Sequence, residues 1–156
     1  MSKTERAQDT RGHGDSSPRT AGSQTEERIV TRPVTILFVE DNDVVLRVVK
    51  KTLELEGWRV EVYEDGDAAL RGLEGEGRYD LIIADDDLPG ARGIELIRRA
   101  RTLPHRRETP IIMFSSCPNR DEALGAGADE FLQKPEGIYA VRETVALLLG
   151  GQGRHA

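Results

Sequence analysis

The sequence predicts an α/β domain in which helices cover both faces of an open, five-stranded parallel sheet. From Val34 onward, short apolar runs alternate with stretches of helical period. Two of the apolar runs, 35–39 and 80–84, lead directly into acidic residues. Five strands and about five helices in about 115 residues favour a sheet whose strands are all parallel and buried on both sides.

The first strand is expected at 35–39, where Thr-Ile-Leu-Phe-Val forms an apolar run that ends in two acids. The helix expected next, at 43–56, has apolar residues at three- and four-residue spacing, which is typical of one buried face. These residues are Val45, Val48, Val49 and Leu53.

The later elements follow the same alternation, and the apolar run Leu81–Ala84 indicates that the third strand is buried. The fourth helix is expected to be short, because Gly125 and Gly127 follow only a brief amphipathic segment. The remaining strands are expected at 59–63, 80–84, 110–114 and 130–133, and the remaining helices at 66–74, 93–102, 119–125 and 137–149.

The chain divides into one domain and two tails. Residues 1–33 are polar and charged, with too little apolar surface to offset chain entropy, so we expect a disordered N-terminal tail. The domain is expected at 34–149 and a flexible tail at 150–156, with no attached output domain. No apolar run approaches the roughly 20 residues of a spanning helix, and no secretory signal begins the chain, which favours a cytoplasmic protein without membrane insertion.

Composition excludes several classes of site. The net charge is −6, and the sequence shows neither a basic stripe nor an aromatic platform, which argues against direct binding of nucleic acid. The one cysteine, Cys117, cannot form an intramolecular disulfide, and the three histidines are scattered without ligand-like spacing. Zinc is therefore not expected.

Chemically active side chains follow four of the predicted strands. Because parallel strands place their carboxyl ends at one edge of the sheet, these groups should converge. They are Glu40, Asp41, Asp85, Ser115 and Lys134. Carboxylates gathered in this way suit magnesium, and a carboxylate beside bound magnesium can accept a phosphoryl group as an aspartyl phosphate. A lysine and a hydroxyl are suitable donors to the phosphoryl oxygens.

The ordered motifs FVEDND, DLIIADDDLPGARG, PIIMFSS and GADEFLQKP resemble those of the receiver domain of bacterial two-component response regulators. The resemblance covers roughly residues 34–149. It implies a flavodoxin-like sheet of strand order 2-1-3-4-5 and magnesium-dependent phosphotransfer. The donor would be a phosphohistidine on a sensor histidine kinase or a histidine phosphotransfer protein, and the output would be contact with a downstream protein.

The resemblance also selects the acceptor among three consecutive aspartates. The family motif has a proline four residues and a glycine eight residues after the acceptor, and Asp85 alone satisfies both, with Pro89 and Gly93. By the same resemblance, Asp41 would bind magnesium directly, Glu40 would act through water as an outer acid, and Asp87 would offer its backbone carbonyl. Asp86 is interpreted as an exposed loop acid with no chemical role.

Ser115 and Lys134 match the family's hydroxyl and lysine, and Phe131 stands at the position of its switch aromatic. Composition alone would assign Phe131 to the core. The Lys134–Pro135 bond is of a type that permits a cis peptide. The short fourth helix and Glu136, which replaces a common aromatic or apolar residue, put the family's usual output surface in doubt.

Two alternatives remain open. The domain could be a docking or localisation module that works without phosphorylation, as the altered fourth helix suggests. It could instead be a phosphatase of the haloacid dehalogenase type, because Asp85 and Asp87 satisfy that family's Asp-x-Asp core, although Pro89 stands where Thr or Val is usual. The main hypothesis describes a phosphoacceptor rather than a turnover enzyme.

Overall fold

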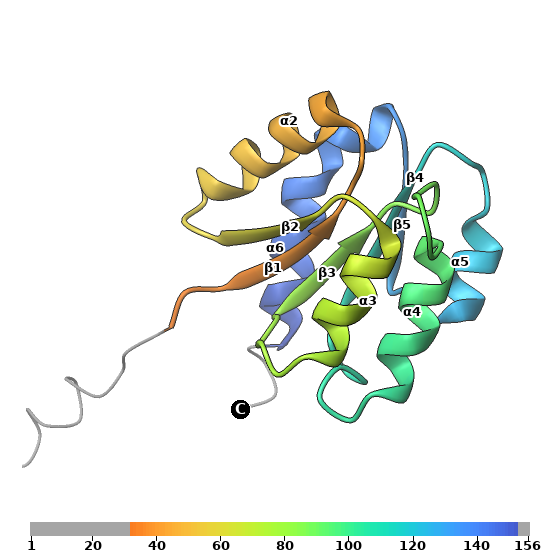
Figure 1. Cartoon of the computed structure of the whole chain (residues 1–156). Helices are drawn as coiled ribbons and strands as arrows, with labels where there is room; N and C mark the ends of the chain where they lie inside the picture. Colours follow the sequence, from red (N-terminus) through yellow and green to blue (C-terminus); the bar gives the residue numbers. More distant parts are fainter. Residues whose placement is uncertain (1–31, 153–156) are drawn as a thin grey trace, which may run out of the picture. The chain divides into compact units, whose positions relative to one another are not determined.

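The computed structural model describes residues 32–152, which form one five-stranded sheet with helices on both faces (Figure 1). All four strand pairings are parallel, and the strand order is β2-β1-β3-β4-β5. The strands are β1 (Thr35–Val39), β2 (Arg59–Tyr63), β3 (Leu81–Ala84), β4 (Ile111–Ser115) and β5 (Glu130–Gln133). The predicted fold class and strand order are confirmed.

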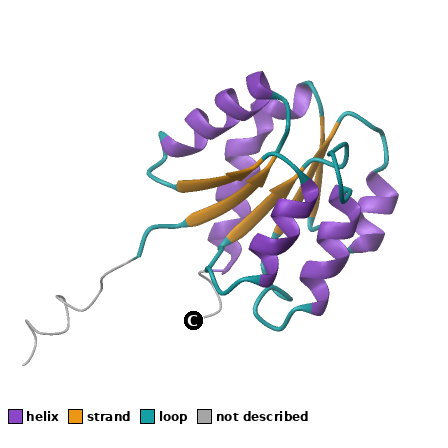
Figure 2. Ribbon diagram, in the orientation of Figure 1, coloured by secondary structure: helices purple, strands orange, loops and turns teal. Residues whose placement is uncertain are grey.

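The helical elements alternate with the strands along the chain, as Figure 2 shows. They are α2 (Asp43–Glu54), α3 (Gly66–Glu74), α4 (Gly93–Thr102), α5 (Arg120–Ala126), the short 3-10 helix η1 (Glu136–Ala140) and α6 (Val141–Gln152). Helix α5 has only seven residues and ends at Gly127, whose φ of 119° is left-handed. A short fourth helix was expected, and a glycine in this conformation stops it.

Alternate residues of each central strand enter two separate apolar clusters, because successive side chains of a strand point to opposite faces. On β1, for example, Leu37 belongs to the cluster covered by α3, α4 and α5, whereas Phe38 belongs to the cluster covered by α2 and α6. The two helix layers are visible on either side of the sheet in Figure 1. Burial on both faces explains why the central strands are continuously apolar.

Several element boundaries differ from those predicted. Strand β4 is shifted by one residue, because Pro110 has no backbone N–H to contribute to the ladder. Helix α2 ends two residues early, where Leu55–Gly57 turns and Gly57 has a φ of 84°. On α2, Val49 and Leu53 are buried as expected, but Val48 is 46% exposed and lies outside the predicted buried face.

The last helix begins and ends later than expected. Residues 136–140 form the 3-10 helix η1, and α6 then continues through two glycines to Gln152. The boundary predicted between helix and tail at 149 is therefore three residues too early. Leu148 and Leu149 pack against the α2–α6 side of the sheet, which supports the final turn. The expected tails, 1–33 and 150–156, lie mostly outside the described residues.

Candidate functional site

The carboxyl ends of β1, β3, β4 and β5 meet at one edge of the sheet, and the backbone register brings the predicted site residues together there. The amide of Asp85 donates to the carbonyl of Val39 at 3.0 Å, which aligns the ends of β3 and β1. The amide of Lys134 donates to the carbonyl of Ser115 at 2.8 Å, which aligns β5 with β4. The pairing of the parallel strands thus places the residues that follow each strand at the same edge of the sheet.

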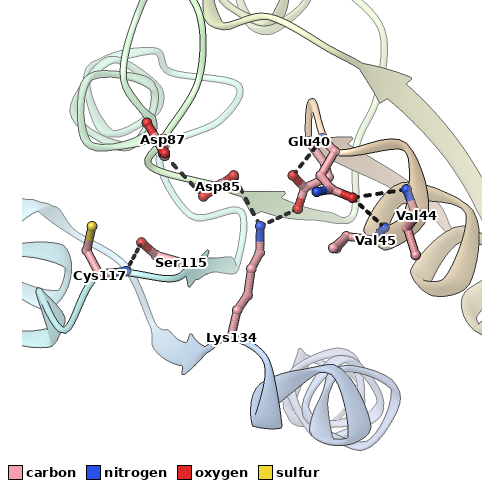
Figure 3. Close-up of polar contacts among 9 residues, drawn as sticks. Glu40, Val44, Val45, Asp85, Asp87, Ser115, Cys117 and Lys134 are labelled. Carbon is pink, nitrogen blue, oxygen red and sulfur yellow. Dashed lines mark hydrogen bonds and ion pairs between the residues drawn. The ribbon is translucent and has the colours of Figure 1, made fainter.

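Lys134 joins the two buried acids of this edge (Figure 3). Its Nζ lies 2.5 Å from Glu40 Oε1 and 3.1 Å from Asp85 Oδ2, and its side chain is only 10% exposed. Glu40 is fully buried and Asp85 is 4% exposed. Buried carboxylates require such compensation, because each loses its hydration on folding.

A pocket of about 640 Å³ opens beside these acids. Carboxylate oxygens of Glu40, Asp41 and Asp85 all lie within 4.8 Å of one another, and Asp41 is exposed. Oxygen ligands so closely spaced fit magnesium, a hard cation that retains several waters. The pocket is lined by Glu40, Asp41, Asn42, Val45, Asp85, Asp87, Ser116, Lys134, Pro135 and Ile138.

Burial raises the pKa of Glu40 above its ordinary value, since removal from water disfavours the charged form. The hydrogen bond and charge of Lys134 oppose this shift, as does the Asn42 amide, which donates to Glu40 Oε2 at 3.1 Å. Asn42 also begins α2, because its Oδ1 accepts from the amides of Val44 and Val45. Asn42 thus connects the acid cluster to the helix that follows it.

The carboxylate of Asp85 is held at both oxygens. Oδ2 faces Lys134, while Oδ1 accepts from the backbone amide of Asp87 at 3.2 Å. The side chain of Asp87 is exposed and lines the pocket. Two donors on different elements therefore orient the carboxylate that the sequence motif selects as acceptor.

Gly93 gives a physical reason for the spacing used to select Asp85. A Cβ at position 93 would lie 2.2 Å from the carbonyl oxygen of Asp85, so only glycine lets the start of α4 pack against the loop that follows β3. At the start of α3, a Cβ at position 66 would lie even closer to the backbone, 1.7 Å from the carbonyl oxygen of Ala91. The loop that carries Asp85 thus packs closely against the first residues of both α3 and α4.

The remaining predicted residues lie on β4 and β5. Ser115 is fully buried, and its Oγ accepts from the amide of Cys117 at 3.1 Å (Figure 3). Its neighbour Ser116 lines the pocket. Phe131 is 7% exposed and packs in the cluster beneath α3, α4 and α5. The Lys134–Pro135 peptide bond is cis.

The interpretation of Asp86 as an exposed acid is wrong. It is 5% exposed, and its carboxylate accepts from Arg92, from the Ile94 amide and from Asn119. Arg92 is the N-cap residue of α4, but its side chain accepts no hydrogen bond from the helix amides. The carboxylate of Asp86 accepts from the Ile94 amide instead and so caps α4. Its role depends on side chains 6 to 33 residues away, which no local pattern could reveal.

The parallel sheet of strand order β2-β1-β3-β4-β5, with acids gathered at its carboxyl edge, places the chain in the flavodoxin-like class of α/β domains. Comparison with known proteins identifies the family. A model of the response regulator receiver domain matches residues 36–146. The chain belongs to this family, the receiver domain of two-component response regulators. Family membership and the receiver sheet leave no support for the haloacid dehalogenase alternative.

One curated relative illustrates the extent of the similarity. It is 36% identical over 119 residues to the transcriptional regulatory protein ResD of Bacillus subtilis, a match that covers 74% of this chain and 46% of the relative. The chain thus spans about half the length of this curated relative.

Two solved structures are similar along nearly their whole length. A CheY-like receiver domain protein from Methanospirillum hungatei has a TM-score of 0.72 at 29% identity, covering 80% of this chain and 100% of that one. The receiver domain of a sensor histidine kinase from Pseudomonas aeruginosa has a TM-score of 0.69 at 32% identity, covering 76% of this chain and 99% of that one. That structure has magnesium coordinated in its active-site cleft.

Receiver domains, the family to which this chain belongs, are signalling domains. Among residues 32–152, no helix combines the length and apolar character needed to cross a membrane.

Proposed function

We propose that Asp85 accepts a phosphoryl group from a phosphohistidine in a magnesium-dependent reaction, and that the phosphorylated domain signals by contact with another protein. The observation that carries this proposal is the environment of the Asp85 carboxylate. It is buried, it is oriented by Lys134 and the Asp87 amide, and it lies beside two further acids. Such a preorganised carboxylate suits an in-line displacement at phosphorus.

In the proposed reaction, a carboxylate oxygen of Asp85 forms a bond to phosphorus while the bond from phosphorus to the donor's imidazole nitrogen breaks. The imidazole leaves with the electron pair, and the product is an acyl phosphate. Neutralisation of charge on the phosphoryl oxygens is the chemistry that bound magnesium would supply here. Asp41 and Asp85 would bind the ion directly, Glu40 would act through water, and Asp87 would contribute its backbone carbonyl.

Lys134 and Ser115 would act on the phosphoryl group after transfer. Lys134 already contacts Asp85 Oδ2, so its ammonium would pair with a phosphoryl oxygen with little movement. The Ser115 hydroxyl would donate to another oxygen, and the strand that carries it adjoins β5 and Phe131. A shift shared by Ser115 and Phe131 would bias two pre-existing states of the domain.

The proposed partners are a sensor histidine kinase or a histidine phosphotransfer protein as donor and a downstream protein as output, all meeting the domain in the cytoplasm. The acidic charge of the chain supports a protein rather than a nucleic acid as the direct partner.

Intact mass spectrometry after treatment with acetyl phosphate and magnesium tests the acceptor. The wild-type protein should gain one phosphoryl group, and Asp85→Asn should gain none. Asp87→Asn is the matched control, since it keeps the backbone carbonyl and should still be labelled. Labelling of Asp85→Asn together with loss in Asp87→Asn would refute the assignment.

A second candidate function is a docking module that works without phosphorylation. Two observations favour it: α5 has only seven residues, and Ser115 Oγ is engaged by its own loop at Cys117. Amide chemical shifts separate the two functions. A phosphorylation switch should move resonances from residue 115 through 134, including Phe131, whereas changes confined to the surroundings of Asp85 would favour the docking module.

A further inference from the structure

A polar cluster, built around the buried carboxylate of Asp86 and reaching half-exposed side chains at the surface, lies beside the acceptor pocket and takes no part in the chemistry proposed above. It consists of Asp86, Arg92, Asn119 and Glu122, and we call it the Asp86 cluster. Asp86 Oδ2 accepts from Arg92 at 2.5 Å and from Asn119 Nδ2 at 3.0 Å, while Oδ1 accepts from the Ile94 amide at 3.1 Å. Arg92 also lies 3.8 Å from Glu122 on α5. The cluster therefore ties the residue after the acceptor to both α4 and α5.

Asn119 is held in this cluster at a cost. A carboxylate can only accept, so Asn119 must present its NH₂ group to Asp86, and this fixes the direction of its Oδ1. Oδ1 is then a buried oxygen with no hydrogen-bond partner among the described residues. An unsatisfied buried acceptor is unfavourable, and native structures contain few of them.

The same residue stands at the N-cap of α5, and its side chain makes no capping hydrogen bond there within the described structure. Asparagine is among the best N-cap residues, because its Oδ1 accepts from the second or third amide of a helix. For α5 these are the amides of Asp121 and Glu122. The backbone of Asn119 has φ −105° and ψ 41°, outside the extended conformation typical of an N-cap. A move of this residue toward the extended conformation, with rotation of its side chain, would exchange the contact with Asp86 for a cap on α5 and would satisfy the unpaired oxygen.

The loop that carries Asn119 also carries Ser115. Ser115 Oγ accepts from the amide of Cys117. Two residues further along the chain, Asn119 donates to Asp86. A displacement of Ser115 toward a group on Asp85 would therefore pull on the segment 116–119. The position of Asn119 is mechanically linked to the acceptor through this short segment.

We propose that Asn119 is a two-position latch. In the unphosphorylated domain it is held by Asp86, which leaves α5 uncapped, and on phosphorylation it leaves Asp86 and caps α5. That phosphorylation triggers the change of position rests on the proposed function, whereas the existence of the two positions does not. The latch gives the short α5 a way to respond to Asp85, because its existing first turn would gain a side-chain cap.

Hydrogen exchange in the unphosphorylated protein tests the two positions. Asp86→Ala should loosen the first turn of α4, which loses its acceptor, and should free Asn119 to cap α5. We expect the amides of Asp121 and Glu122 to exchange roughly fivefold more slowly than in wild type, the usual scale of an N-cap. In the double variant Asp86→Ala, Asn119→Ala this gain should vanish.

A second variant keeps the test decisive if Asp86→Ala is too unstable. Asn119→Asp would be repelled by Asp86 and would itself be a good cap, so it should slow exchange of the same two amides relative to Asn119→Ala and to wild type. Equal exchange of these two amides in wild type and in Asn119→Asp would overturn the latch, whether or not Asp86→Ala can be measured.

The phosphorylated protein tests the trigger. After treatment with acetyl phosphate and magnesium, with labelling verified by intact mass, the side-chain NH₂ resonances of Asn119 should shift and the Glu122 amide should become protected. Asp85→Asn treated identically should show neither change. Unmoved Asn119 resonances in fully phosphorylated protein would overturn the trigger while leaving the proposed function intact. Absence of labelling would instead overturn the proposed function, and the exchange measurements would still decide whether Asn119 has two positions.

Discussion

Lys134 Nζ lies 3.1 Å from Asp85 Oδ2, although 49 residues separate the two in sequence. The same nitrogen contacts Glu40, so one cation compensates two buried carboxylates. Removing one member of such a set leaves the others uncompensated, which costs more than the ion pair contributes. The stability of the metal-free domain should consequently depend on this single lysine.

We expect Lys134→Ala to lower the free energy of unfolding by about 3 kcal/mol without magnesium, because two carboxylates then share a buried site without a cation. Magnesium should restore more stability to this variant than to wild type. Urea denaturation with and without magnesium measures both effects. Lys51→Ala, which removes an exposed lysine from α2, is the control and should be nearly neutral. Equal magnesium gains in Lys134→Ala and wild type would contradict this account.

The pH dependence of stability should report on Glu40. Its pKa is raised by burial, so the folded state binds its proton more tightly than the unfolded state does. Without magnesium, wild type should therefore gain stability relative to Glu40→Gln as the pH falls from neutral through the raised pKa, and the gain should level off below the ordinary value of 4.5. Melting temperatures across this range measure it. A difference between the two proteins that does not vary with pH would argue against a raised pKa.

Magnesium should stabilise the fold by mass action, because unfolding disperses the carboxylates that bind it. Asp41→Asn should reduce the magnesium-dependent rise in melting temperature, since an amide is a weaker ligand than a carboxylate. Asp43→Asn makes the same substitution two residues away, outside the cluster of closely spaced acids, and should keep the full rise. An undiminished rise in Asp41→Asn would exclude Asp41 as a ligand.

Two glycine substitutions test the packing of the acceptor loop. Gly93→Ala would place a Cβ 2.2 Å from the Asp85 carbonyl oxygen and should destabilise the domain by about 2 kcal/mol. Gly125→Ala meets nothing within 4 Å and should stabilise α5 by about 0.5 kcal/mol, because alanine is the better helix former. Chemical denaturation compares the two. Similar stability changes in both variants would mean that the loop can relax away from α4.

The fold could be predicted because its signals are local. Apolar runs, helical periods and the glycines after position 124 are all visible in short windows of sequence. They predicted the strands and helices with boundary errors of a few residues. The errors fall where local signals compete. Val48 fits the helical period of α2 but is exposed, and α6 continues through glycines because neighbouring leucines pack on the sheet.

The candidate site was predictable only in part. Strand ends indicate which acids converge, and the spacing to Pro89 and Gly93 in the family motif selects Asp85 as the expected acceptor. The environment of Asp86 could not be predicted, because its partners Arg92 and Asn119 reach it through tertiary packing. The engagement of Ser115 by Cys117 likewise depends on the conformation of a loop that has no periodic pattern.

The most direct test of the central claim is to locate the phosphoryl group by chemical reduction and peptide mass spectrometry. Borohydride converts an aspartyl phosphate to homoserine, so the modified residue is identified by fragmentation of the peptide that contains the three aspartates. After treatment with acetyl phosphate and magnesium, we predict homoserine at position 85 and unmodified aspartate at 86 and 87. Homoserine at 86 or 87, or at none of the three positions, would contradict the account.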